Sequence, residues 1–329
     1  MRTGHPEQQQ RLYAKLCREL GPSTLTALSD PDVTEVMCNP DGSLWTESHS
    51  GGMRQAADRL SATQIESLIG TVAALLGTVA HGRAPIVEGE LPITGYRFEG
   101  ILPPVSTAPT FVIRKSASQL YTLDDYAKSG IITLAQLEVF RDAIRTRRNI
   151  VIAGGTASGK TTLGNALIRE IVDAGDPAER IIILEDTREL QCEARNAVQL
   201  HTGDVADLTR LVRVTMRLRP DRIIVGEVRG AEALALLKAW NTGHPGGITT
   251  IHANSAAAAL LRLESLVQEA GVPAQPRLVV ETVDLVAFIV RTPEGRRIKE
   301  LARVSAYDAK RGGYVLEPVC PIAREVAHA

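Results

Sequence analysis

The chain has few aromatic residues, few cysteines and almost no excess of charge of either sign. Among its 329 residues, 4% are aromatic, four are cysteine, and the formal net charge is −1. A near-neutral charge excludes a strong overall attraction to nucleic acid. Scarce aromatic side chains also disfavour a stacking platform for single strands. Direct nucleic-acid binding is therefore not indicated.

The cysteines also exclude two classes of small protein. Cys17, Cys38, Cys192 and Cys320 lie far apart, without a C-x-x-C pair. This spacing is not that of a zinc site or of a disulfide framework, and it indicates reduced thiols in a cytoplasmic protein. The N-terminus has no apolar signal segment, and the apolar stretch 67–80 is shorter than the about 20 residues of a spanning helix. We expect any work at a membrane to be peripheral.

One segment, GGTASGKT at residues 154–161, has the G-x-x-x-x-G-K-[ST] spacing of a phosphate-binding loop. The apolar run 149–153 before it predicts a buried strand, and apolar residues at helical spacing over 162–174 predict a helix after it. Strand, loop and helix in this order are the context that the motif requires. A glycine turn that binds no ligand is the alternative interpretation.

The loop predicts binding of ATP with Mg²⁺. Its glycines let backbone N–H groups point at phosphate oxygens, and the following helix adds its positive N-terminus. Lys160 can reach the β- and γ-phosphates, and the Thr161 hydroxyl can ligate Mg²⁺. The expected nucleotide-binding residues are Gly154, Gly155, Thr156, Ala157, Ser158, Gly159, Lys160, Thr161 and Thr162.

Acidic residues follow two further apolar runs. Glu185 and Asp186 end one run, and Gly226 and Glu227 end the next. Phosphate-loop enzymes normally carry a metal-binding aspartate where Gly226 stands, so we expect Glu227 to polarise the attacking water. A solvated side chain or a helix cap is the alternative for each acid. The expected metal-binding set is Thr161, Glu185, Asp186 and Glu227.

A histidine ends the next apolar strand. His252 follows the strand 248–251, and Gly246 and Gly247 precede that strand. A lone histidine is often a structural residue. At the end of a sheet strand after two glycines, we expect His252 to sense the γ-phosphate rather than to act as the base.

The pattern of elements changes along the chain. Strands alternate with helices from about residue 131 onward, which predicts a mainly parallel α/β sheet. Residues 1–115 are expected to form a smaller, mixed α+β domain. The polar segment 116–130 is the expected linker, and 131–329 is the expected phosphate-loop ATPase domain.

These motifs resemble those of the secretion-superfamily traffic ATPases, which power type IV secretion, conjugation, type II secretion and type IV pili. The phosphate loop carries the resemblance together with ILEDTRE at 183–189, RPDRIIVGEVRG at 219–230 and TTIHAN at 249–254. The segments GYRFEGILPPV at 95–105 and FVIRK at 111–115 are similar to the conjugal-transfer branch, TrbB.

The resemblance implies a RecA-like C-terminal domain and a hexameric ring of copies, with nucleotide held between the two domains and the linker as hinge. It also implies that arginines neutralise phosphate charge, with Arg114 first, Arg97 second and Arg188 third. Surface ion pairs are the alternative for each arginine. The expected function is a motor for type IV secretion or conjugative DNA transfer, in pilus assembly or substrate transfer. Inner-membrane secretion-channel components are the expected partners, at the cytoplasmic face.

Three other functions stay open from the sequence. A type II secretion or type IV pilus motor is nearest, although such motors often carry a four-cysteine metal module that these cysteines cannot form. A DNA translocase would use the stripe of Arg210, Arg213 and Arg217 as a DNA surface, but the near-neutral charge favours a subunit interface or pairing with the acidic segment. A nucleotide-gated scaffold would bind ATP without hydrolysis.

Overall fold

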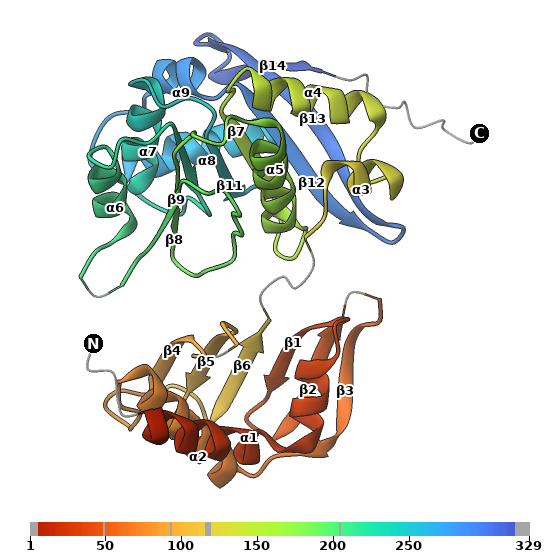
Figure 1. Cartoon of the computed structure of the whole chain (residues 1–329), viewed down its shortest axis with the longest axis vertical. Coiled ribbons are helices and arrows are strands. Elements are labelled where there is room, and N and C mark those ends of the chain that lie inside the picture. The colour runs from red at the N-terminus through yellow and green to blue at the C-terminus, as the bar shows by residue number, and fades with distance from the viewer. Residues whose placement is uncertain (1–5, 49, 93, 116–119, 204, 320–329) are drawn as a thin grey trace. The chain divides into compact units, whose positions relative to one another are not determined.

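The protein forms two compact units that divide after residue 118 (Figure 1). The structure is a computed structural model and describes residues 6–48, 50–92, 94–115, 120–203 and 205–319. The first unit is built on an antiparallel sheet with two helices, and the second on a mainly parallel sheet with helices on both faces. The predicted fold class is confirmed.

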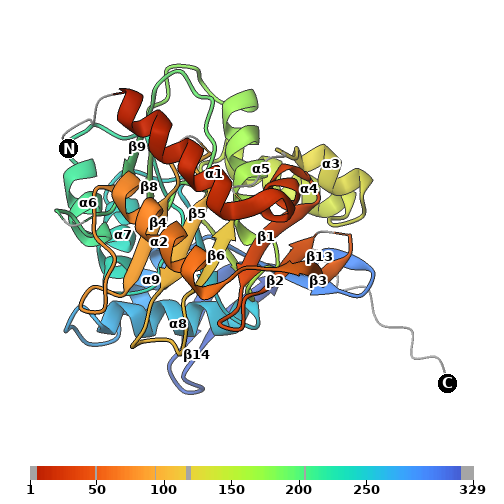
Figure 2. The same ribbon diagram turned by 90° about the horizontal axis from the view of Figure 1, so that it is seen from below.

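The first unit has a six-stranded sheet in the order β3-β2-β1-β6-β5-β4, with every neighbouring pair antiparallel. Figure 2 shows α1 and α2 side by side. The elements are α1 (Pro6–Ser29), β1 (Val33–Cys38), β2 (Ser43–Ser48), β3 (Gly52–Arg59), α2 (Ala62–Leu76), β4 (Ile86–Glu90), β5 (Arg97–Ile101) and β6 (Thr110–Arg114).

The core of the first unit lies between these helices and one face of the sheet. Leu16 of α1 and Ile65 of α2 are buried in one cluster with Phe98 of β5. The ends of α2 are set by local chemistry, because Ser61 forms a capping box at its start and Gly77 adopts a left-handed φ of 73° at its end. Buried residues of β5 and β6 alternate with more exposed ones, so one face of the sheet packs on the core and the other is more exposed.

The second unit has an eight-stranded sheet in the order β14-β13-β12-β7-β11-β10-β8-β9. Strands β12 to β9 pair in parallel, and β13 and β14 extend the sheet in antiparallel fashion. The elements are α3 (Leu123–Lys128), α4 (Leu134–Arg145), β7 (Ile150–Gly154), α5 (Lys160–Ala174), β8 (Ile181–Glu185), β9 (Ala197–His201), α6 (Leu208–Thr215), β10 (Arg222–Val225), α7 (Glu232–Asn241), β11 (Ile248–His252), α8 (Ala256–Gln268), α9 (Pro276–Thr282), β12 (Leu285–Thr292), β13 (Gly295–Asp308) and β14 (Gly313–Pro318).

The central strands of this sheet are apolar on both faces because helices cover both. In β7, Val151 and Ala153 join the core beneath α6, α7, α8 and α9. Ile150 and Ile152 join the core beneath α3, α4 and α5. Burial on both sides accounts for the continuous apolar runs from which parallel strands were predicted. None of the described helices combines the length and the hydropathy that a membrane crossing requires.

Part of the segment expected to be a linker is a helix. α3 begins after Thr122, whose hydroxyl accepts from the N–H of Asp125 while the Asp125 carboxylate accepts from the N–H of Thr122. Leu123 and Tyr126 are buried in the core that α4 and α5 share. Residues from Leu123 onward are therefore folded into the second unit, whereas 116–119 lie outside the described residues.

A buried ion pair connects Arg222, at the start of β10, with Glu179, in the loop between α5 and β8. Arg222 is 3% exposed, and its Nε lies 2.9 Å from Glu179 Oε2. Its guanidinium also donates to the carbonyl oxygens of Ile144 and Gly246, at 3.1 and 3.3 Å. Burial lowers the pKa of the Arg222 guanidinium, and the charge of Glu179 opposes that effect. This arginine is therefore a structural residue of the sheet.

Replacing Glu179→Ala would leave Arg222 buried without its counter-charge. We expect the free energy of unfolding of the second unit to fall by about 3–5 kcal/mol. Asp142→Ala, which removes the partner of the exposed Arg145, should cost at most about 1 kcal/mol. Urea unfolding followed by Trp240 fluorescence in a Trp45→Phe background measures both. Equal losses in the two variants would contradict the structural role of the buried pair.

Candidate nucleotide site

The phosphate loop leaves β7 at its carboxyl end and leads directly into α5. Gly159 precedes the helix with a left-handed φ of 100°, and no side chain caps the helix start. The positive end of the α5 dipole therefore faces the phosphate loop, where an anionic ligand is favoured. Ala157 also has a positive φ, 56°, which is uncommon for a residue other than glycine and is found at ligand-binding turns.

The first two glycines of the loop meet different requirements. A Cβ on Gly154 would lie 2.6 Å from the carbonyl oxygen of Ile289 in β12 and against the Ser158 hydroxyl. A Cβ on Gly155 would meet nothing within 4 Å. Packing against β12 therefore requires glycine at 154, whereas glycine at 155 keeps the open side of the loop free.

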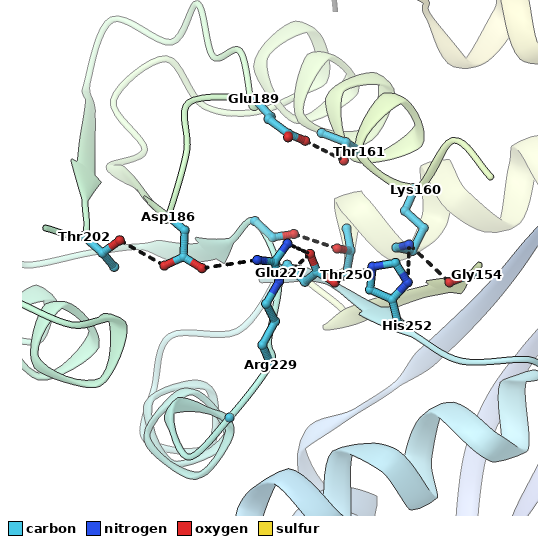
Figure 3. A network of polar contacts seen from close by, with 12 residues as sticks. Gly154, Lys160, Thr161, Asp186, Glu189, Thr202, Glu227, Arg229, Thr250 and His252 are labelled. Atoms are coloured by element: carbon cyan, nitrogen blue, oxygen red, sulfur yellow. Dashed lines mark hydrogen bonds and ion pairs between the residues drawn. The ribbon is translucent and has the colours of Figure 1, made fainter. Parts of the chain in front are cut away.

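Lys160 is held in the loop by three acceptors. Its Nζ donates to the carbonyl oxygens of Gly154 and Gly155, at 3.2 and 2.9 Å, and lies 3.3 Å from His252 Nδ1 (Figure 3). β11 pairs with β7 in parallel and places His252 opposite Gly154. The strand register thus brings the predicted histidine directly to the predicted lysine.

From His252 the contacts continue to Glu227 and Arg229 (Figure 3). His252 Nε2 lies 2.9 Å from Glu227 Oε1, and Glu227 Oε2 accepts from Arg229 Nε and Nη2, at 2.9 and 2.6 Å. Because the Lys160 ammonium only donates, His252 Nδ1 is the acceptor and Nε2 carries the proton. We call Lys160, His252, Glu227 and Arg229 the polar chain.

Arg229 is a member of the polar chain to which the sequence assigned no role at this site. Burial lowers the pKa of its guanidinium, but the hydrogen bonds and charge of Glu227, with Asp186 and Glu189, outweigh burial and raise it. The two hydrogen bonds that Arg229 donates to Glu227 Oε2 hold this carboxylate in place. Arg229 follows Glu227 by two residues, and that short spacing was the only signal in the sequence.

The two acids after β8 lie in different environments. Glu185 is 3% exposed, and its Oε1 accepts from the N–H groups of Glu189 and Leu190, at 3.1 and 2.8 Å. Asp186 is more exposed, accepts from the Thr202 hydroxyl and lies 4.0 Å from Arg229 Nη1. Glu185 therefore shapes the turn after β8, and Asp186 borders the polar chain.

Gly226 is explained by its neighbour on β8. A Cβ at this position would lie 3.0 Å from Glu185 Cγ. The Gly226 carbonyl accepts from the Thr250 hydroxyl at 2.8 Å. The glycine that replaces the usual aspartate is therefore the residue that fits beside the inward-facing Glu185.

The Thr161 hydroxyl meets an acid that was not among the predicted ligands. It donates to Glu189 Oε2 at 3.1 Å (Figure 3). Glu189 belongs to the same acidic segment as Glu185, but the turn after β8 decides which acid faces the loop. Asn165 holds this turn, since it donates to the Glu189 carbonyl and accepts from the N–H of Gln191.

The donors around Thr161 suit Mg²⁺ bound together with phosphate. Within the described part of the chain, no three His, Cys, Asp or Glu residues form a cluster that could hold a metal alone. Thr161 and Glu189 offer hard oxygen atoms, and Mg²⁺ commonly takes one or two protein ligands and completes its shell with phosphate and water. The residues present therefore fit a magnesium–nucleotide complex better than an isolated metal site.

The glycines before β11 serve packing. A Cβ on Gly247 would lie 2.5 Å from the Ile223 carbonyl oxygen and would collide with the Trp240 indole nitrogen. Trp240 Nε1 donates to that same carbonyl at 3.0 Å. Gly246 and Gly247 thus give no support to a phosphate contact of their own, and His252 approaches the loop through strand register alone.

The predicted arginines lie in different parts of the chain. In the first unit, Arg97 and Arg114 are directly opposite each other on β5 and β6, and Arg114 Nε lies 3.4 Å from Glu35 Oε1. Arg188 is exposed on the turn after β8 in the second unit. Each of the two arginines of the first unit also has an acid opposite it on its other neighbouring strand, Glu35 on β1 for Arg114 and Glu90 on β4 for Arg97.

The arginine stripe of α6 and the turn after it is exposed. The Arg210 guanidinium donates to the Val205 carbonyl at 2.9 Å. No ion pair joins Arg210, Arg213 or Arg217 to the acidic segment 185–189 among the residues that the structure describes. Pairing with that segment, one of the sequence-based interpretations, is therefore not seen in the part of the chain that the structure describes.

Comparison with known proteins agrees with the geometry. The family model "Type II/IV secretion system protein" matches residues 79–312. The chain is 52% identical to a probable conjugal transfer protein TrbB of Sinorhizobium fredii, with 93% of each chain covered. It is 53% identical to the conjugal transfer protein TrbB of Rhizobium radiobacter, covering 90% of this chain and 91% of that one.

A solved structure shares the fold. The Legionella pneumophila ATPase DotB is similar with a TM-score of 0.62 at 22% identity, covering 94% of this chain and 83% of that chain. At this identity the likeness concerns the fold alone.

Gly154→Ala and Gly155→Ala test the two roles of the loop glycines. We expect Gly154→Ala to lower the free energy of unfolding of the second unit by about 1–3 kcal/mol, because the new methyl group overpacks against β12. Gly155→Ala should leave stability within about 0.5 kcal/mol of the unmodified protein, since its methyl group meets open space. Urea unfolding measures both, and a larger loss for Gly155→Ala would refute this division of roles.

Proposed function

The chain belongs to the type II/IV secretion system protein family, and from this premise we propose that it is an ATPase motor of type IV secretion or conjugative transfer. The observation that carries the proposal is the polar chain at the phosphate loop. Lys160, His252 and Glu227 come from three segments that lie far apart in the sequence, and each contacts the next. Such an arrangement positions charge and water at a terminal phosphate.

ATP is the proposed substrate, bound by residues Gly154–Thr162. Lys160 now rests on two backbone carbonyl oxygens. The phosphates are stronger acceptors than neutral carbonyls, so Lys160 would turn to them when ATP binds. That movement would release His252 Nδ1, which is how His252 could respond to the γ-phosphate.

Glu227 is the residue that we assign to the attacking water. Its carboxylate is mostly buried, with 17% of the side chain exposed, and Arg229 holds it in one orientation. A carboxylate fixed in this way can accept a hydrogen bond from water and align it for in-line attack. His252 on the other oxygen keeps Glu227 close to the lysine that binds the phosphate.

Mg²⁺ would be held by Thr161 together with the phosphates of the nucleotide, and it would neutralise charge on the β- and γ-oxygens. Glu189 contacts the Thr161 hydroxyl and is the acid best placed to bind the ion through water. In this proposal Asp186 and Glu227 contact the ion only through water molecules. Glu185 contributes less directly, because its Oε1 already accepts two backbone N–H groups.

The arginines of the first unit are proposed to stabilise charge that develops on the γ-phosphate. Arg114 and Arg97 form a pair of opposed cations on one face of the sheet. Glu35 pairs with Arg114 at 3.4 Å, and Glu90 lies opposite Arg97 on β4. A phosphate would compete with these carboxylates for the two guanidinium groups. Arg188 is the third candidate for this role.

We assign the motor to a ring of copies of this chain, hexameric by its family resemblance. It would work at the cytoplasmic face of the inner membrane with components of a secretion channel. The conjugal transfer names of the two relatives that are more than half identical support conjugation over other branches of the family. The transported substrate would not need to bind the ATPase directly, in keeping with the near-neutral charge.

Glu227→Gln should abolish turnover while leaving nucleotide binding intact. We expect kcat to fall by about 100-fold or more, because the amide is a poor acceptor for the attacking water. The measurement is ATPase activity per subunit against protein concentration. Activity of the unmodified protein should rise with concentration as rings assemble. Glu138 is an exposed acid on α4, and Glu138→Gln is the matched control. It should change neither kcat nor the dependence of activity on protein concentration.

The outcomes of that experiment separate the parts of the proposal. Activity that is independent of concentration would contradict the need for assembly. Turnover that survives in Glu227→Gln would contradict the role of this carboxylate. ATP binding without hydrolysis by the unmodified protein would favour a nucleotide-gated scaffold instead.

Arg114→Ala should lower kcat by about 100- to 1000-fold, which is the usual loss when one donor to a developing negative charge is removed. Arg59→Ala on β3, whose guanidinium pairs with Asp41 at the surface, is the matched control. Steady-state ATPase assays on both variants, with melting temperatures to establish folding, test this role. Unchanged turnover in Arg114→Ala would leave Arg114 as a partner of Glu35 only.

A further inference from the structure

A second cation lies against the phosphate loop, on the side away from His252. Arg296 is the second residue of β13, and the β12–β13 hairpin is directly joined to β7 through β12. A Cβ built on Gly159 would lie 2.9 Å from Arg296 Cδ and 3.2 Å from its Nε. The stem of this arginine therefore packs on the glycine from which α5 begins.

The Nε group of Arg296 has no acceptor. This nitrogen is buried, and no hydrogen-bond partner for it exists among the described residues. A buried donor without a partner is unfavourable, and more so when it carries charge. The Arg296 charge acts on the nearby Tyr126. Burial raises the pKa of the Tyr126 phenol, and the Arg296 charge opposes that rise. A neutral phenol does not supply a counter-charge.

The topology separates the two sides of the loop. β7 has β11 on one side, with His252 opposite Gly154, and β12 on the other. Lys160 and His252 therefore mark the end of the site where the terminal phosphate is expected. Arg296 marks the opposite end, toward the phosphates that join the nucleoside.

We propose that Arg296 is a nucleotide-binding residue whose guanidinium donates to an oxygen of the phosphates that ADP and ATP share. This inference rests on the proposed nucleotide site and adds a residue to it. Because Nε is buried against Gly159, the guanidinium would turn toward the nucleotide on binding, and the phosphate would then supply an acceptor for Nε and a counter-charge. In return the loop gains a contact that does not depend on the γ-phosphate, so Arg296 holds ADP as well as ATP.

The experiment is ADP binding by isothermal titration calorimetry to the full chain and three variants. Arg296→Gln should weaken ADP binding by about 10- to 100-fold, as expected for loss of a hydrogen bond to a charged group. Arg297→Gln is the matched control, because this adjacent arginine is exposed on the opposite face of β13. Its ADP affinity should equal that of the unmodified protein. Lys160→Ala should lose binding altogether.

Competition by inorganic tripolyphosphate identifies the part of the nucleotide that Arg296 contacts. If Arg296 binds phosphate, the Arg296→Gln substitution should lower the affinity for tripolyphosphate by about the same factor as the affinity for ADP. A lower affinity for ADP together with an unchanged affinity for tripolyphosphate would overturn the phosphate contact. Arg296 would then be assigned to the ribose or the base. Melting temperatures exclude unfolding as the cause, and Arg296→Lys replaces Arg296→Gln in the same comparison if the glutamine variant does not fold.

Failure of the inference is distinguishable from failure of the proposed function. Unchanged ADP affinity in Arg296→Gln, with binding lost in Lys160→Ala, would overturn the role of Arg296 and keep the loop as the nucleotide site. Absence of ADP binding by the unmodified protein would overturn both.

Discussion

The packing of β7 between β11 and β12 is the constraint on which the candidate site depends. His252 lies opposite Gly154 on one side, and the Ile289 carbonyl packs against Gly154 on the other. Backbone pairing fixes both neighbours, and the cores on the two faces of the sheet fix the strand. The loop consequently starts from a defined point at the carboxyl edge, which is where open parallel sheets bind their ligands. The geometry of the site is a property of the sheet more than of the loop.

The polar chain follows from that geometry, with one cation at each end and the Glu227 carboxylate between them. Lys160, neutral His252, anionic Glu227 and cationic Arg229 each contact the next. Glu227 and Arg229 compensate each other before a nucleotide arrives, and the Lys160 ammonium is hydrogen-bonded to neutral acceptors. A phosphate can nevertheless compete for Lys160, because its present acceptors include two neutral carbonyl groups. When Lys160 exchanges its present acceptors for phosphate oxygens, the surroundings of His252 and Glu227 would change, although the sheet itself would not rearrange.

Local patterns in the sequence account for the bounds of several elements. α2 (Ala62–Leu76) has a capping box, a helical period and a terminal glycine, and β6 (Thr110–Arg114) lies between prolines and charge. Strands β3 and β9 lie at the sheet edges and were not predicted: β3 is largely exposed and shows no apolar alternation, and β9 has only Val198 and Leu200 as large apolar residues. α3 was not predicted because one and a half turns give too short a period. Tertiary burial, which the sequence does not display, decides these cases.

The contacts of the candidate site likewise divide into those that the sequence predicted and those that it could not predict. Spacing and strand order predicted that Lys160, Glu227 and His252 would gather, since all three follow parallel strands that end at one edge. They could not predict that Glu185 would turn toward backbone N–H groups while Glu189 reached Thr161, because a few ångströms in the turn after β8 decide between them. Gly226 shows the dependence most clearly. A Cβ at 226 would lie 3.0 Å from Glu185 Cγ, so Glu185 would have to shift to admit a side chain there. The sequence shows neither residue's dependence on the other, because they meet only through the pairing of β8 with β10.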